Sequence, residues 1–218
     1  MKIFNHKKIN LPSIERISHN GQRYYKTPGG RIYPSVSSVS SFDSREDIEE
    51  WRDRVGEKNA TLISEKASSR GTRIHSLCED FLKNEIVNPE EDDTFVWNSI
   101  APILCNIDDI YGIELPLYSD ILEVAGTTDC IAYYNGKLSV IDFKTSKKPK
   151  RLEWIRGYIY QCVMYAVSFM ELTGLYINQI VIIIGVDNNE PQVFVEKVDD
   201  WVNRVIKCRD RYFKHYNK

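Results

Sequence analysis

The chain has 218 residues, of which 42% are apolar and 28% are charged, and its formal net charge is −2. This length and apolar content suffice for a sizeable core, so we expect residues 1–218 to form a single domain. The near-neutral charge excludes a strongly basic DNA-binding module, so any contact with nucleic acid has to come from a local patch.

The apolar segments and the amino end of the chain indicate where in the cell we expect it. The longest of them, residues 157–170 and 180–186, are shorter than the about 20 residues that cross a bilayer. The amino end lacks the apolar core of a signal peptide and carries Glu15, so we expect a cytoplasmic protein with no membrane partner. The five cysteines are odd in number and scattered, which is typical of reduced thiols.

The first half of the chain predicts an extension followed by helices. Residues 1–45 are expected to form strands and turns in front of a core of residues 46–218. Thr27-Pro28-Gly29-Gly30 is a strong turn signal after the Tyr-rich segment 22–26, which predicts a hairpin. Three helices are predicted next, over about residues 45–55, over about 57–84, and from Asn88-Pro89 onwards.

The second and third helices have recognisable faces. In the second, Gly71, His75 and Glu79 fall on one face at a spacing of four residues, apart from an apolar stripe. That stripe consists of Ile74, Leu77, Cys78 and Phe81. The third helix is expected to bury Phe95, Val96, Ile100, Ile103, Leu104 and Ile107.

The apolar period then changes from that of helices to that of strands. Strands are predicted over residues 112–117, 121–125, 127–134, 137–145, 177–186 and 191–196, and helices over 152–172 and 199–215. Helices before and after such strands predict an α/β or α+β layered domain, with a central mixed sheet flanked by helices.

One predicted hairpin carries two acids and a lysine among apolar residues. Asn135-Gly136 is a strong signal for a two-residue turn, which would place Asp129 directly opposite Asp142. Their Cβ atoms would then be about 4.5–5.5 Å apart, and Lys144 would point to the same face. Two converging carboxylates form a hard-oxygen site for Mg²⁺ or Mn²⁺, although a cross-strand ion-pair network remains the alternative.

Glu114 is a further candidate for this face. A tight turn at Ser119-Asp120 would pair Glu114 with Ala125 and so place it on the side of Asp129. There it would either join the metal ligands or hold Lys144.

The order of these motifs resembles a known family of nucleases. An acid followed by acid-x-lysine on the next strand is similar to the core of the PD-(D/E)XK superfamily, with Thr128-Asp129 in place of the usual Pro-Asp and Asp142-Phe143-Lys144 as the second element. Upstream, Arg70-Gly71-Thr72-Arg73-Ile74-His75 with Glu79, and downstream, Gln161-x-x-x-Tyr165, resemble the motif set of RecB-type exonuclease domains. Residues 33–37 and Trp51 also resemble the mitochondrial genome maintenance exonuclease family and its phage relatives.

The resemblance implies both a fold and an activity. The fold would be a restriction-endonuclease-like core with an N-terminal helical and hairpin extension. The activity would be that of a metal-dependent DNA exonuclease acting on single-stranded ends or flaps, in phage or bacterial replication, recombination or repair. The cofactor would be Mg²⁺ or Mn²⁺, and no iron–sulfur cluster is expected because the clustered cysteines of those family members are absent.

Roles for individual residues follow from the resemblance. Asp129, Asp142, His75 and the main-chain carbonyl of Phe143 would bind metal, and Lys144 would position or deprotonate the attacking water. A lone helical histidine is usually a surface or core residue, so His75 depends on its motif for this role.

Four further residues are expected on the substrate side of the site, and two alternative functions remain. Gln161 and Tyr165 would lie near the substrate, and basic residues at Arg70 and Lys147 would contact DNA. Without the family, Tyr165 would be read as a core residue. A structure-specific endonuclease on the same fold and a catalytically inactive nucleic-acid-binding module remain as alternatives.

Overall fold

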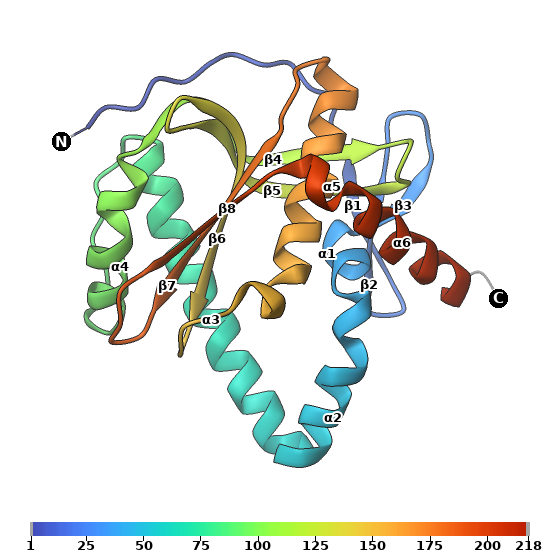
Figure 1. The fold of residues 1–218 in the computed structure, drawn as a ribbon, viewed down its shortest axis with the longest axis horizontal. Coiled ribbons are helices and arrows are strands. Elements are labelled where there is room, and N and C mark those ends of the chain that lie inside the picture. The colour runs from blue at the N-terminus through green and yellow to red at the C-terminus, as the bar shows by residue number, and fades with distance from the viewer. Residues whose placement is uncertain (1, 217–218) are drawn as a thin grey trace.

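A five-stranded mixed sheet forms the centre of the computed structural model, which describes residues 2–216 (Figure 1). Its strands follow one another in chain order, and only β6 and β7 are parallel. The strands are β4 (Ile107–Ser119), β5 (Val124–Tyr134), β6 (Lys137–Ser146), β7 (Gln179–Val186) and β8 (Gln192–Glu196). The expected mixed sheet flanked by helices is confirmed.

Helices cover both faces of this sheet. Helices α3 (Glu57–Leu82) and α4 (Glu91–Leu104) pack on one face with Ile141, Val181 and Ile183. Helices α5 (Arg156–Thr173) and α6 (Val198–Tyr216) pack on the other with Val140, Ile180 and Ile182. Because successive side chains of a strand point to opposite faces, β7 is apolar from Ile180 to Val186, and Val140 and Ile141 of β6 serve one layer each.

A smaller sheet packs against the N-terminal end of β5. Its antiparallel strands are β1 (Glu15–His19), β2 (Gln22–Lys26) and β3 (Ile32–Pro34), so the expected N-terminal hairpin is confirmed. Tyr25 and Tyr33 are buried against Ala125 of β5, which attaches this sheet to the core. The chain continues into α1 (Val36–Ser40), a single turn at Phe42–Ser44, and α2 (Arg45–Val55).

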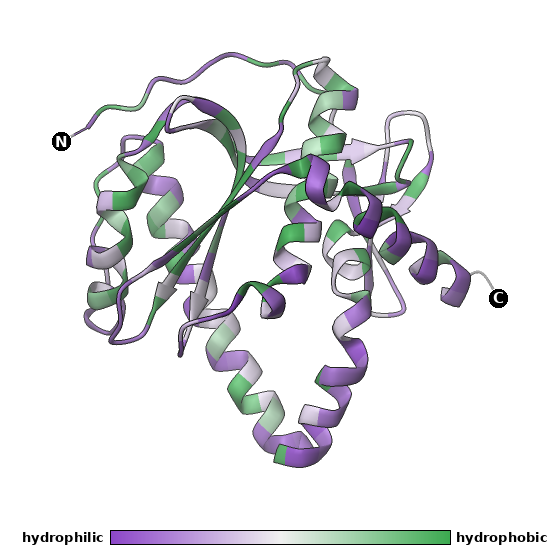
Figure 2. Cartoon of the chain, viewed as in Figure 1, coloured by the Kyte–Doolittle hydropathy of each residue, from purple (hydrophilic) through white to green (hydrophobic). Residues whose placement is uncertain are grey.

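Helix α2 and the first half of α3 form a hairpin that projects from the body of the protein (Figure 1). Gly56 joins them with a φ of +80°, a conformation that glycine adopts without strain. Both helices of this projection are largely hydrophilic (Figure 2), and α2 contains no buried residue. The projection is therefore not held by a core of its own.

Several expected elements differ in detail. Residues 124–134 form one strand because Gly126 continues the extended chain and does not turn it. The helix opened at Asn88-Pro89 ends at Leu104, and Ile107 already belongs to β4. Phe95 is 51% exposed, so its expected burial is wrong.

The end of the α5 segment is as expected. A short turn over Leu152–Trp154 precedes α5, and Gly174 ends the helix in a left-handed conformation with a φ of 72°. None of the helices within residues 2–216 combines the length and the apolar character needed to cross a membrane.

Candidate active site and metal centre

The two central acids lie in the middle of the neighbouring strands β5 and β6, and the predicted direct pairing of Asp129 with Asp142 is not part of the ladder. The β5–β6 register runs from Tyr134 opposite Lys137 to Cys130 opposite Ile141, which is the expected register. The ladder ends one pair before Asp129 and Asp142. There the carboxylate Oδ2 of Asp129 accepts a hydrogen bond of 2.8 Å from the main-chain amide of Phe143.

The β4–β5 register brings Glu114 to Asp129 by a route that the sequence does not predict. The turn spans residues 120–123 and pairs Ser119 with Val124, so the expected pairing of Glu114 with Ala125 is wrong. Ile113 pairs with Cys130 and Leu115 with Thr128, which places Glu114 across from Asp129. The positive φ of Glu114, 49°, marks a local irregularity of β4 at this point.

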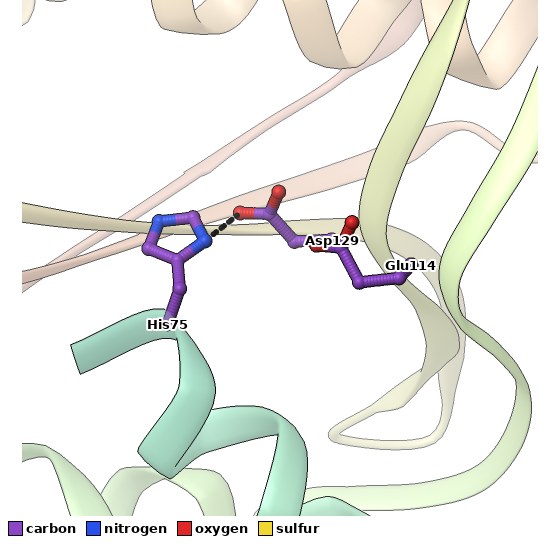
Figure 3. A group of neighbouring side chains, drawn as sticks. All are labelled: His75, Glu114 and Asp129. Atoms are coloured by element: carbon purple, nitrogen blue, oxygen red, sulfur yellow. Dashed lines mark ion pairs between the residues drawn. The ribbon is translucent and has the colours of Figure 1, made fainter. Parts of the chain in front are cut away.

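His75 completes a cluster of three metal-ligating side chains with Glu114 and Asp129 (Figure 3). One ligand atom from each residue lies within 4.8 Å of the others. The Nδ1 atom of His75 is 3.5 Å from Oδ2 of Asp129. Helix α3 supplies the histidine from outside the sheet, while two neighbouring strands supply the acids.

The electrostatics of this cluster indicate a place for a cation. Burial, together with the negative charges of Asp129 and Glu79, raises the pKa of Glu114 to about 7. Like charges at this distance repel one another unless a positive charge lies between them. Histidine nitrogen with carboxylate oxygen is a donor set that suits Mn²⁺ and, less commonly, Mg²⁺.

Asp142 and Lys144 form a second, buried pair beside the cluster. The ammonium of Lys144 donates to Oδ1 of Asp142 at 2.6 Å, and Gln161 on α5 donates to the same oxygen at 3.1 Å. Oδ2 of Asp142 is buried and has no hydrogen-bond partner among the described residues. A buried carboxylate oxygen without a partner is costly, and a divalent cation would satisfy it.

The charge state of Lys144 follows from its neighbours. Burial alone would lower the pKa of Lys144, but the carboxylates of Asp142 and Asp129 outweigh it, so the pKa lies above its ordinary value. Burial raises the pKa of Asp142, against the opposing charge of Lys144. The carbonyl of Phe143 lies 3.4 Å from the Lys144 ammonium, next to the same acid. Lys144 is therefore a cation at neutral pH.

These groups open into a cavity of about 450 Å³. His75, Glu114, Asp129, Lys144, Gln161 and Tyr165 all line it. Tyr165 is 4% exposed and lies against Gly126, where an added Cβ atom would be 2.6 Å from the tyrosine hydroxyl. Glycine at 126 therefore makes room for the ring at the cavity wall.

The two basic residues expected to contact DNA lie apart from this cavity. The guanidinium of Arg70 donates to Asp187 at 2.6 Å, and neither residue lines the cavity. Lys147 is exposed just beyond β6 and does not line the cavity either.

A wall of the cavity also comes from residues that the sequence does not single out. Arg16 on β1 and Arg23 on β2 line it together with Tyr25. The Tyr-rich pattern predicts a hairpin at this position, but the hairpin's docking against β5 is a long-range contact with no local signal.

Comparisons with known proteins found exonucleases that are similar in sequence to part of this chain. The human protein named mitochondrial genome maintenance exonuclease 1 is 31% identical over 131 residues, which are 55% of this chain and 38% of the human protein. The mouse protein of that name is 32% identical over 112 residues, 48% of this chain and 33% of its own length. This chain thus spans between a third and two fifths of these relatives. No protein-family model matches it.

A solved structure was also found to be similar. A candidate exonuclease of Eubacterium rectale is 15% identical, with a TM-score of 0.48 over 82% of this chain and 81% of that chain. About half of this chain is therefore similar in sequence to curated exonucleases, which supports the resemblance to nucleases that the motifs indicate.

Proposed function

We propose that this chain, related over half its length to curated exonucleases, is a single nuclease domain that hydrolyses DNA from its ends with the help of a divalent metal. The observation that carries the proposal is the meeting of two groups of side chains where the β5–β6 ladder ends. These are the cluster of His75, Glu114 and Asp129, and the buried pair of Asp142 and Lys144. Such a combination suits hydrolysis of a phosphodiester.

The protein's own groups have distinct roles in this proposal. His75, Glu114 and Asp129 hold Mg²⁺ or Mn²⁺, and the free Oδ2 of Asp142 offers a further ligand. Such an ion polarises the phosphate and acidifies a water molecule. The amide of Phe143 holds Asp129, and Gln161 holds Asp142, so both carboxylates keep their orientation.

Lys144 acts as a cation and not as a base. Its raised pKa favours the ammonium, which can orient the attacking water and balance the charge that develops on the phosphate. Since the Lys144 side chain is 18% exposed and lines the cavity, the ammonium is placed to meet a substrate while it stays paired with Asp142.

The substrate is proposed to be single-stranded DNA or single-stranded ends, with a role in replication, recombination or repair. Support comes from the relatives, which are named exonucleases of mitochondrial genome maintenance. No iron–sulfur cluster is required by this scheme, because nitrogen and oxygen ligands suffice.

The proposal is tested with end-labelled linear and circular single-stranded DNA in Mn²⁺, Mg²⁺ or EDTA. The native chain is compared with Lys144→Ala and with Lys137→Ala, a matched control at the far, exposed end of the same strand. We expect metal-dependent loss of the linear strand, abolished in Lys144→Ala and retained in Lys137→Ala.

The same assay separates the alternatives. Cutting of the circle would identify an endonuclease. A chain that shifts labelled DNA in a gel and leaves it intact in every metal would be a binding module.

A further inference from the structure

The active cavity has two walls of opposite charge. The wall formed by the large sheet and α3 carries Glu114, Asp129 and His75, whereas the wall formed by the small sheet carries Arg16 and Arg23. An anionic strand that approaches the acids needs compensating cations nearby, because the acids repel phosphate until a metal is bound. The small sheet supplies these cations.

The two arginines share one face of the hairpin. Arg16 pairs with Tyr25 and Ser18 with Arg23, so both arginine side chains leave the sheet on the side of Tyr25. As diagonal neighbours on adjacent strands they are about 7 Å apart, a span that two guanidinium groups can close around one phosphate.

Both guanidinium groups are free to bind a ligand. Arg16 and Arg23 are exposed, and neither takes part in an ion pair or a side-chain hydrogen bond with the part of the chain that the structure describes. Arg31, just before β3, behaves differently, since it pairs with Asp120 and hydrogen-bonds Tyr33. The open pair is therefore a specific feature of the cavity wall.

The backbone beneath these side chains is fixed to the catalytic sheet. Tyr25 and Tyr33 are 5% and 6% exposed and pack on Ala125, which lies four residues before Asp129 on β5. The carbonyl of Arg23 accepts a hydrogen bond of 3.1 Å from the amide of Ser35, and Ser35 bridges to Ala125. The arginines thus keep a set position relative to the acids.

We propose that Arg16 and Arg23 form a phosphate-binding subsite that holds a phosphodiester of the DNA strand next to the one that is cleaved. The inference rests on the proposed nuclease function and deepens it by assigning residues that position the strand. Arginine suits this task because its planar fork bonds two phosphate oxygens at once. The contact reads the backbone and not the bases, so it is independent of sequence.

The test measures binding and cleavage in parallel. Fluorescein-labelled oligo-dT is titrated with protein in EDTA over a series of KCl concentrations, and KM and kcat are measured with Mn²⁺. The variants are Arg16→Gln/Arg23→Gln and Arg16→Lys/Arg23→Lys. Lys26→Gln is the matched control, because this exposed lysine lies on the opposite face of the same strand as Arg23.

We expect the glutamine variant to lower the slope of log affinity against log salt by about 0.7, since the two arginines together neutralise one phosphate and each single-strand phosphate contributes about 0.7. KM should rise at least about tenfold with little change in kcat, because charge-assisted hydrogen bonds to substrate are lost. The lysine variant should restore the slope but not the whole of the affinity. Thermal unfolding should be unchanged, because both side chains are exposed.

The outcomes distinguish this inference from the proposed activity. A glutamine variant that matches Lys26→Gln in slope and KM overturns the subsite and leaves the nuclease standing. A native chain that binds DNA and does not cleave it overturns the proposed nuclease activity. In that case the change in salt slope of the glutamine variant still shows whether Arg16 and Arg23 bind phosphate. A native chain that neither binds nor cleaves overturns both.

Discussion

Replacing Glu114 with glutamine should stabilise the protein when no metal is present. The pKa of Glu114 is raised from 4.5 to about 7 in the folded state, chiefly by burial and then by Asp129. A carboxyl group with a raised pKa binds its proton more tightly in the folded than in the unfolded chain. Its contribution to stability is therefore greatest below pH 4.5 and declines as pH rises to about 7.

The magnitude follows from that change. At about 1.36 kcal/mol per pKa unit, the raised pKa of Glu114 would lower the free energy of unfolding by about 3 kcal/mol above pH 7. The carboxylate opens to solvent at the cavity, and screening by water reduces the effect to about 1 kcal/mol. For a chain of this size, that is a rise in Tm of about 2–4 °C on removal of the charge.

Thermal unfolding of native protein and Glu114→Gln in EDTA at pH 5 and pH 8 measures this difference. We expect a higher Tm for the variant at pH 8 and equal values at pH 5. Saturating Mn²⁺ should reverse the order at pH 8, because a ligand at a hundred times its Kd adds about 2.7 kcal/mol to the native protein only. Glu190→Gln, in the exposed turn between β7 and β8, is the control.

A lower Tm for Glu114→Gln at pH 8 in EDTA would refute this reasoning. It would mean that the carboxylate makes a stabilising contact in the metal-free protein and is not held there against charge repulsion.

Three further changes test the packing and chemistry around the site. Gly126→Ala should lower stability by about 1–3 kcal/mol, because the new methyl group meets the Tyr165 hydroxyl; urea unfolding should show partial recovery in Gly126→Ala/Tyr165→Phe, and equal losses in both would contradict the proposed clash. Asp187→Asn should cost about 1–3 kcal/mol in urea unfolding because Arg70, whose Nη2 atom is buried without a partner, loses its ion pair. Asp53→Asn on the exposed face of α2 should cost little, and equal losses would argue against that pair. Lys144→Arg should lower kcat by about a hundredfold or more, because the larger planar group cannot keep the contact with Asp142 inside the cavity; retained activity would show that charge alone is needed.

The parts of the site that sequence predicts are those set by local rules. Asn135-Gly136 fixes a two-residue turn, and the turn fixes the register up to Cys130 and Ile141. Asp129 and Asp142 are the next residues beyond this register, so the sequence predicts that they lie close together but not that the ladder ends before them. The helical spacing places His75 on a face away from the apolar stripe, as the structure shows.

The parts that sequence does not predict depend on irregular strands and distant contacts. Glu114 reaches Asp129 through a turn two residues longer than expected, so the predicted position on the side of Asp129 was correct although the predicted pairing with Ala125 was wrong. Phe95 has helical spacing but lies on the exposed side of α4, because spacing alone does not locate the edge of a buried face. Arg16 and Arg23 line the cavity only because the small sheet packs against β5, and no local pattern in the sequence predicts that contact.

Phe143 connects the two layers of the protein at the site. Its amide holds Asp129 on the α5 side of the sheet, while its ring, 1% exposed, packs in the layer of α3 and α4. The ring also lies edge-on to His75, with ring centroids 6.2 Å apart. A change in the packing of that layer would therefore displace His75, a proposed metal ligand on the helix, and the amide that orients the proposed ligand Asp129 on the strand, so repacking here would alter reactivity and stability together.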